Sequence, residues 1–185
     1  MKKILLLALL TFYACNTSEN TKTVSKKEYS LELPGFLSEG NDLNEDASLQ
    51  YRNYFKEFYV IVIDESKSEF NNMVTENEFL EEYSPDIEGY SQLIIDNLET
   101  TVTFENQTLE DSKTNGLSTK ILKFDGKYEG IDVYYQIAFI QSKKNYYQIM
   151  SWTLAEKRQD YEPLMDKMMA SFKTNYQNKA AKKNS

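Results

Sequence analysis

The stretch IDVYYQIAFIQSKKNYYQIMSWTL, residues 131–154, decides the fold of this chain. Every second residue from Val133 to Phe139 is large and apolar, which predicts a β-strand over 131–141. A polar turn at 143–145 leads into a second strand over 146–154. With a third strand predicted just upstream over 119–125, the stretch forms an antiparallel meander.

Two more strands are predicted on the N-terminal side of the meander. Residues 29–33 alternate apolar and polar side chains, and Pro34-Gly35 ends that strand. The polar loop over 36–46 follows. The continuous apolar run at 58–63 then predicts a central strand that is buried on both faces.

Helices are predicted in the remaining segments. Residues 64–88 are acidic and helical in character with a break at Pro85, and an apolar stripe at helical spacing follows from Ile87 to Leu98. The last helix is predicted to begin at an Asp160 N-cap and to bury a methionine-rich stripe. This order of elements predicts an α+β fold in which helices pack on an antiparallel β-sheet.

Residues 1–14 read as a bacterial lipoprotein signal. A short basic start and an apolar segment of about seven residues precede Ala14-Cys15, too short a segment to span a bilayer. This arrangement resembles a lipobox, in which the signal is removed and the cysteine is acylated, although Phe12 stands where leucine is usual. The alternative is an ordinary secreted protein with one free thiol, which is unusual in exported chains. We therefore expect a lipid, such as palmitate, on Cys15.

The rest of the chain divides into three parts. Residues 15–26 are predicted to be the lipidated cysteine and a flexible tether, 27–174 a single domain, and 175–185 a polar tail. Asn16 does not resemble the usual inner-membrane retention signal, so we expect an outer-membrane anchor that faces the periplasm. We therefore expect the chain to bind the membrane through the lipid on Cys15.

Composition excludes several kinds of chemistry. The 185 residues contain no histidine and one cysteine, which rules out zinc, copper and haem sites built on His or Cys, intrachain disulfides, and serine or cysteine hydrolysis through a histidine base. Without the two lysines of the signal, 19 basic residues face 29 acidic ones, a net charge of −10 that disfavours nucleic-acid binding. We expect no cofactor and no enzyme activity, and catalysis by carboxylates or tyrosine alone has no support in the sequence.

The order of elements is similar to that of PsbP-like and DcrB-like domains. The resemblance rests on the opening strand from Tyr29 to Pro34, the middle helix, the meander with its Trp152-Thr153 pair, and the closing stretch from Tyr161 to Lys173. It spans roughly residues 27–173 and implies a non-catalytic binding or assembly module with a PsbP-like α/β sandwich. Fold resemblance alone is a weak basis for function.

The acidic segment and one loop are candidate sites. Within 64–88, the carboxylates are candidates for docking a basic partner, and the alternative is a solvated helix face. The partner-binding candidates are Glu76, Glu78, Glu81 and Glu82. Asp42, Asn44 and Asp46 match the first ligand positions of a calcium loop, but Ala47 and Asn53 stand where glycine and an acid are needed, so we expect no metal site.

Four tyrosines around one hairpin form a second candidate site. Tyr134, Tyr135, Tyr146 and Tyr147 are predicted to point alternately to the two faces of the sheet. One face must be core, and the other is either covered by a helix or open as a surface for a sugar or peptide. The expected function is a lipid-anchored accessory module that binds or helps assemble another envelope protein. The alternative is a periplasmic binding module for a small molecule, a glycan or a cation.

Overall fold

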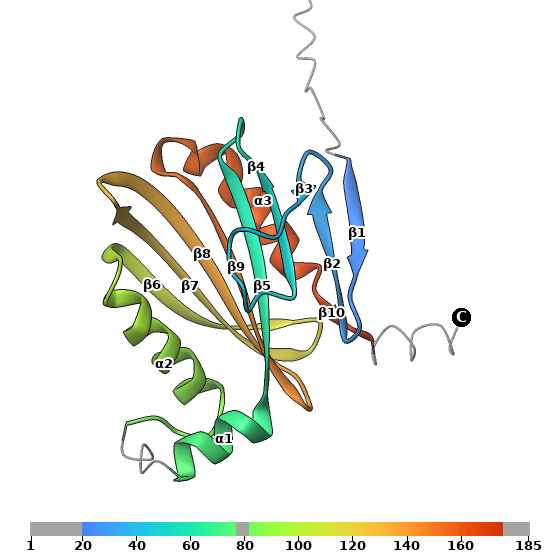
Figure 1. Ribbon diagram of the computed structural model, residues 1–185, viewed down its shortest axis with the longest axis vertical. Coiled ribbons are helices and arrows are strands. Elements are labelled where there is room, and N and C mark those ends of the chain that lie inside the picture. Colours follow the sequence, from blue (N-terminus) through green and yellow to red (C-terminus); the bar gives the residue numbers. More distant parts are fainter. Residues whose placement is uncertain (1–19, 77–81, 176–185) are drawn as a thin grey trace, which may run out of the picture.

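Two antiparallel sheets and three α-helices make up the described part of this computed structural model, residues 20–76 and 82–175 (Figure 1). The large sheet runs in the order β3 (Ser38–Glu39), β4 (Leu49–Asn53), β5 (Phe58–Ser66), β9 (Asn145–Leu154), β8 (Ile131–Gln141), β7 (Leu117–Tyr128) and β6 (Thr103–Thr114). The small sheet runs in the order β1 (Thr21–Ser25), β2 (Tyr29–Pro34) and β10 (Lys173–Thr174). The fold is α+β, as the sequence predicted.

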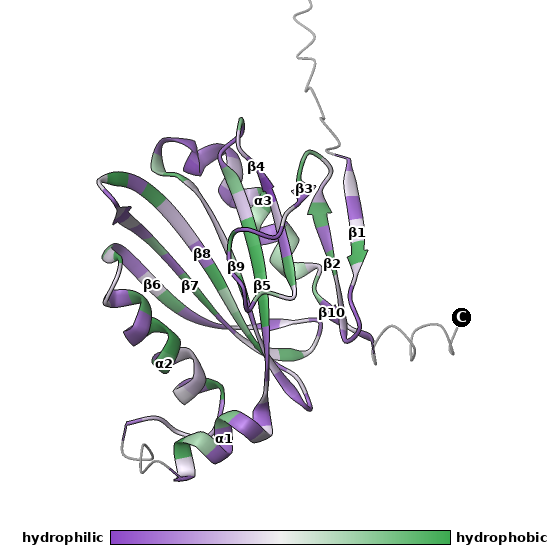
Figure 2. Ribbon diagram, in the orientation of Figure 1, coloured by the Kyte–Doolittle hydropathy of each residue, from purple (hydrophilic) through white to green (hydrophobic). Residues whose placement is uncertain are grey.

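The predicted meander is present as β7, β8 and β9. Tyr135 on β8 lies opposite Phe124 on β7 and Trp152 on β9, so the three strands are in one register. The apolar run forms β5, which pairs with β9 in the interior of the sheet (Figure 2). Strand β6 was not predicted, because most of its side chains are exposed and an exposed edge strand carries no apolar alternation.

The helices cover opposite faces of the large sheet. On one side, α3 (Arg158–Ala170) packs its methionines against a core that includes Leu31 of β2 and Val60 of β5. On the other side, α1 (Lys67–Glu76) and α2 (Ile87–Glu99) contribute Phe70 and Tyr90 to a second core. We call these the α3 face and the α1/α2 face.

The start of α3 differs from the prediction. The short 3-10 helix η2 (Ala155–Lys157) leads directly into α3, so Lys157 is the N-cap and Asp160 lies in the first turn. The helix therefore begins before the acidic residue that signals its start. Pro163 lies inside α3.

Residues 21–25, which the sequence analysis placed in the tether, form β1. This strand pairs with β2 along its whole length, from Thr21 opposite Pro34 to Ser25 opposite Ser30. The side chains of this edge strand are exposed or half-buried. Its sequence is therefore polar and resembles that of a linker. Cys15 and the C-terminal tail from residue 176 lie outside the described residues.

Candidate functional site

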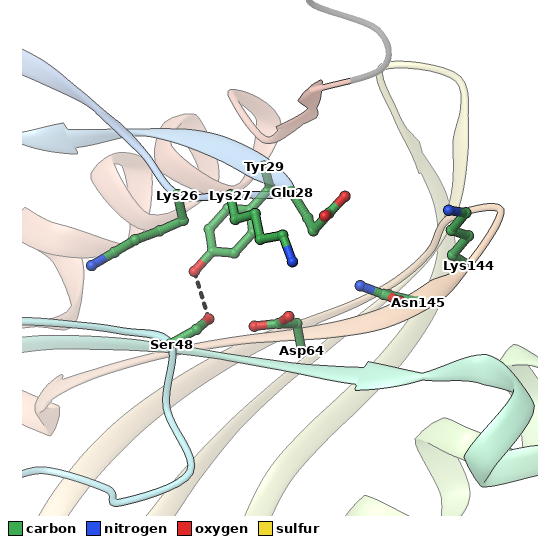
Figure 3. Close-up of a pocket in the computed structure, with 8 residues that line it drawn as sticks. All are labelled: Lys26, Lys27, Glu28, Tyr29, Ser48, Asp64, Lys144 and Asn145. Atoms are coloured by element: carbon green, nitrogen blue, oxygen red, sulfur yellow. Dashed lines mark hydrogen bonds between the residues drawn. The ribbon is translucent and has the colours of Figure 1, made fainter.

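Three hollows surround the end of the large sheet where β5 ends and α1 begins. The first lies between the two sheets and has a volume of about 330 Å³ (Figure 3). The residues that line it are Lys26, Lys27, Glu28, Tyr29, Ser48, Asp64, Lys144 and Asn145. It therefore mixes three ammonium groups with two carboxylates.

Four of the eight side chains of this first hollow, those of Lys26, Tyr29, Ser48 and Asn145, have partners in the fold. The hydroxyls of Tyr29 and Ser48 are 2.8 Å apart and hydrogen-bonded, and burial raises the pKa of Tyr29 well above its usual range. Lys26 forms an ion pair with Glu39 at 3.2 Å. The side-chain amide of Asn175 donates to the Lys26 carbonyl at 2.9 Å. These contacts hold the β1–β2 turn in place, so the partners of Lys26 and Tyr29 are structural.

The second hollow lies between α1, α2 and the end of β5, and its volume is about 340 Å³. Carboxylates from Asp64, Glu65 and Glu69 lie at its border. Its apolar lining comes from the stripes that the two helices turn toward the sheet, namely Phe70, Met73, Tyr90, Leu93 and Ile94. The second hollow therefore combines acidic side chains at its border with an apolar lining.

The Tyr90 ring is the most constrained group in the second hollow. It is fully buried and stacks on Tyr146 with centroids 4.4 Å apart, while Phe70 meets it edge-on at 5.4 Å. Burial raises the pKa of Tyr90 far above its usual range, and the Glu65 carboxylate adds to the effect. The Tyr90 hydroxyl is closed to water, and its polar neighbour is the Glu65 carboxylate.

The third hollow is a shallow surface region at the start of α1, with a volume of about 490 Å³. Ser66 and Ser68 share a hydrogen bond of 2.8 Å there, and the backbone amide of Glu69 donates to Ser66 Oγ at 3.4 Å. Lys143 and Lys144 of the β8–β9 turn lie across from them. These contacts are the ordinary means by which a helix start satisfies its free amides.

The four predicted tyrosines do not form a common surface. Tyr134 and Tyr147 are buried in the core of the α3 face, and Tyr146 is buried in the core of the α1/α2 face. Tyr135 alone is half-buried. The two directions of the side chains agree with the predicted alternation, but helices cover both faces at this hairpin, so a ligand could reach only Tyr135.

The predicted acidic site is described only in part. Glu76, at the end of α1, and Glu82 are exposed, whereas Glu78 and Glu81 lie outside the described residues. In the loop that resembles a calcium site, Asp42 forms an ion pair with Arg52, and Asn44 Oδ1 accepts from the Asp46 amide at 2.8 Å. Over residues 20–76 and 82–175, no group of three or more acidic or cysteine side chains could hold a metal ion.

A ladder of stacked rings crosses the large sheet on the α1/α2 face, and the sequence analysis missed it. From β5 to β6 the rings belong to Tyr59, Trp152, Tyr135, Phe124 and Phe104, with successive centroids 5.3, 6.3, 4.9 and 3.8 Å apart. The strand registers bring these rings together, and no single strand shows the pattern. Since neighbouring rings cover both faces of the three inner rings, the ladder offers no flat platform for a sugar.

Exposed apolar side chains gather at the tips of two hairpins, which we call the hairpin-tip rim. Phe55 is 99% exposed and Tyr54 53% exposed in the β4–β5 turn. Tyr128 and Ile131, at the β7–β8 turn, are 48% and 54% exposed. Both turns lie at the end of the sheet opposite α1 (Figure 1), because β5 and β8 run in the same direction on either side of β9. The sequence contains a signal for this rim, because its apolar residues lie within turn segments.

Comparisons with known proteins show the fold. The solution structure of cyanobacterial PsbP (CyanoP) from Synechocystis sp. PCC 6803 matches with a TM-score of 0.56 and 10% identity, covering 87% of this chain and 95% of that one. A crystal structure of a protein of unknown function, PA94 from Pseudomonas aeruginosa, matches at a TM-score of 0.41 and 13% identity over 82% and 94% of the two chains, which is too low to add to the argument. No protein-family model matches the chain, and no curated protein matches its sequence. The fold is therefore PsbP-like.

Within residues 20–76 and 82–175, no helix is both long enough and apolar enough to cross a bilayer.

Proposed function

We propose that this chain is a lipid-anchored, non-catalytic accessory module of the bacterial cell envelope that binds or helps assemble another envelope protein. The anchor is a lipid on Cys15, which follows a signal-like segment, and the chain faces the periplasm from the outer membrane. The absence of histidine and the use of the only cysteine as anchor support a binding role. The PsbP-like fold is compatible with such a role and does not establish it.

The hairpin-tip rim is the observation that carries the proposal. A phenylalanine that is 99% exposed leaves nearly its whole ring in water, and burial of apolar surface stabilises a contact by about 25 cal/mol per Å². The turn that carries Phe55 is also held in shape, because the Lys56 amide donates to Asn53 Oδ1 at 3.0 Å and Glu57 has a positive φ of 52°. Aromatic anchors on a preorganised surface are typical of protein-binding hot spots.

In-cell crosslinking of a C-terminally tagged full chain tests this proposal. We expect one envelope protein to be enriched, and Phe55→Ser combined with Ile131→Ser to reduce its capture at least tenfold. Leu109→Ser is the matched control, because Leu109 is 41% exposed on the edge strand β6, away from both tips.

Two further variants separate the parts of the proposal. Cys15→Ala should release the chain from the membrane fraction. The double variant Glu76→Lys and Glu82→Lys tests the acidic segment as a docking surface. Equal capture by the wild type and the double serine variant would reject the rim as the binding surface. Membrane retention of Cys15→Ala would reject the lipid anchor.

The alternative function is a periplasmic binding module for a small molecule, a glycan or a cation. The hollow between α1 and α2 favours the small-molecule form, because its volume of about 340 Å³ falls in the range of ligand sites. A thermal-shift screen of glycans, peptides and cations tests this alternative, and a shift with one class of compound at millimolar concentration would support it.

A further inference from the structure

We propose that the envelope protein bound by the hairpin-tip rim is embedded in the same membrane as the lipid anchor, and that it offers the rim an apolar surface with a Lys or Arg side chain. This inference rests on the proposed function, because it needs both the anchor on Cys15 and the rim. It adds the kind of partner, which follows from where the tether leaves the domain, how long the tether is and which charges lie at the rim.

The tether joins the domain beside the β4–β5 turn. The backbone amide of Gly35 donates to the Asn20 carbonyl at 2.6 Å. The carbonyl of the next residue, Phe36, accepts from the Asn53 side-chain amide at 2.8 Å, and the Lys56 Nζ lies 5.1 Å from the centroid of the Phe36 ring. Strand β1 also begins at the end of the molecule that carries the tips of both hairpins (Figure 1). The tether and the rim therefore share one end of the domain.

The tether is short compared with the domain. Because residues 21–25 form β1, the tether comprises only residues 15–20. The five residues that lead from Cys15 to Asn20 span at most about 18 Å when fully extended. Strand β8 has 11 residues, which corresponds to about 36 Å between the rim and the β8–β9 turn. A lipid on Cys15 therefore keeps the rim end close to the bilayer surface, whereas the β8–β9 turn reaches much farther from it.

A soluble partner fits this geometry poorly. A folded domain of about 100 residues has a radius of gyration of about 13 Å and is roughly 30 Å wide, which exceeds the tether length of about 18 Å. Such a domain reaches the rim only from the side, after the anchored chain has tilted. A protein embedded in the same membrane already presents its surface close to the rim, and the anchor raises the effective concentration of the two proteins. The tether therefore favours a membrane-embedded partner.

The charges of the rim favour a protein over the lipid itself. Glu129 is exposed in the β7–β8 turn, between Tyr128 and Ile131. No ion pair of the described residues involves Glu129, whereas Lys127 and Asp132 pair with each other at 3.1 Å. Burial of an unpaired carboxylate among lipids is costly, but a protein surface can place a cation beside an apolar pocket. We therefore expect a lysine or arginine of the partner opposite Glu129.

Photo-crosslinking from position 55 in intact cells tests this inference. The photoreactive residue p-benzoylphenylalanine replaces Phe55 in the full chain, and the fold tolerates the change because Phe55 is 99% exposed. Mass spectrometry of the adduct should identify a peptide of a membrane-embedded protein. The same photoreactive residue in place of Lys143, which is exposed in the β8–β9 turn at the other end of β8, is the matched control and should give less than one tenth of this adduct.

Two changes to the tether separate the kinds of partner. Cys15→Ala should lower the yield of the position-55 adduct at least tenfold, because the released chain loses its effective concentration beside a membrane-embedded protein. Insertion of 40 Gly and Ser residues after Asn16 keeps the lipid and should lower the yield at least threefold. An adduct with a soluble protein whose yield survives both changes would overturn this inference and leave the rim as a docking surface. A phospholipid adduct in place of a protein adduct would also overturn it.

Charge reversal at the rim tests the chemistry of the partner. Glu129→Lys should lower the yield of the position-55 adduct about threefold to tenfold, because it places two cations opposite each other. Glu110→Lys, at an exposed position of β6, is the matched control and should leave the yield unchanged. An unchanged yield with Glu129→Lys would show that the partner carries no cation at this point. If position 55 gives no protein adduct at all, the proposed function fails together with this inference.

Discussion

The two faces of the large sheet both have an apolar core and ion pairs to a helix, but they differ in what covers them, which is α3 together with β2 on one face and two separate helices on the other. On the α3 face, Lys123 lies 2.9 Å from Glu162 and 2.8 Å from Asp166, and Arg158 lies 3.1 Å from Asp125. On the α1/α2 face, Lys120 lies 2.7 Å from Glu88 of α2 and 2.8 Å from Asp111, so charges are paired there as well. Buried polar atoms without a partner among the described residues occur on both faces, at Gln136 Oε1 beneath α3 and at the Tyr146 hydroxyl on the other side. The difference is the hollow of about 340 Å³ between α1 and α2.

This difference indicates where stability and binding are located in the molecule. Charges that are paired beneath a helix contribute to the fold when their partners are in place. A hollow leaves the side chains that border it with fewer packing partners, so their truncation removes fewer contacts. We therefore expect truncation of a ring at the hollow to cost less stability than truncation of a ring packed between two layers.

Truncation of one aromatic ring on each face should give the largest difference. Phe172 is fully buried, with ring centroids 5.5 Å from Tyr29 and 4.8 Å from Tyr147. Phe172→Ala should lower the free energy of unfolding by about 3–5 kcal/mol, because the cavity cannot collapse between two packed layers. Phe70→Ala should cost about 2–3 kcal/mol, because Phe70 already borders a hollow. Urea denaturation measures both, and equal losses would contradict the contrast between the faces.

Loss of the Glu162 charge should give the next largest effect and a specific dependence on pH. Burial alone would raise the pKa of Glu162, but hydrogen bonds from Lys123 and Arg158 outweigh it and lower the pKa from 4.5 to about 2. The folded protein therefore holds this carboxylate ionised at pH values where the unfolded chain binds a proton. Its contribution to stability is fully present above pH 4.5 and is lost as the pH falls toward 2.

Glu162→Gln should consequently cost about 1–3 kcal/mol at pH 7 and progressively less between pH 4.5 and 2. Chemical denaturation at several pH values measures the difference from the wild type. Glu156→Gln, an exposed position just before α3, is the control and should cost less than about 0.5 kcal/mol at any of these pH values. A Glu162→Gln difference that stays constant down to pH 2 would show that the ion pairs contribute nothing.

The sequence predicted those parts of both faces that follow local patterns. Alternation in β2 and the methionine stripe of the last helix indicate side chains of the α3 face, and alternation in β8 and the stripe of α2 indicate side chains of the α1/α2 face. The hollow between α1 and α2 depends on how two helices diverge, and the aromatic ladder depends on the register of five strands. Neither the hollow nor the ladder can be predicted from the residue spacing within a single segment.

The two helix starts offer a smaller contrast between the faces. Asp86 caps α2, because its Oδ1 accepts from the amides of Glu88 at 2.9 Å and Gly89 at 3.2 Å. Lys157 at the start of α3 makes no side-chain cap bond. Asp86→Ala should therefore cost about 1 kcal/mol, and Lys157→Ala close to nothing. Thermal unfolding of the two variants measures this, and a larger loss for Lys157→Ala would mean that α3 also depends on its first turn.

Removal of a single hydroxyl on each face should give the smallest effect and the most direct comparison. The Tyr29 hydroxyl is hydrogen-bonded to Ser48, whereas the Tyr146 hydroxyl is buried without a partner in the described part of the chain. Tyr29→Phe should cost about 0.5–1.5 kcal/mol, and Tyr146→Phe should be neutral or slightly stabilising, since it removes a group whose desolvation nothing offsets. Urea denaturation of both variants under identical conditions gives the two values. If Tyr146→Phe is the more destabilising change, the Tyr146 hydroxyl has a hydrogen-bond partner in solution, such as a buried water.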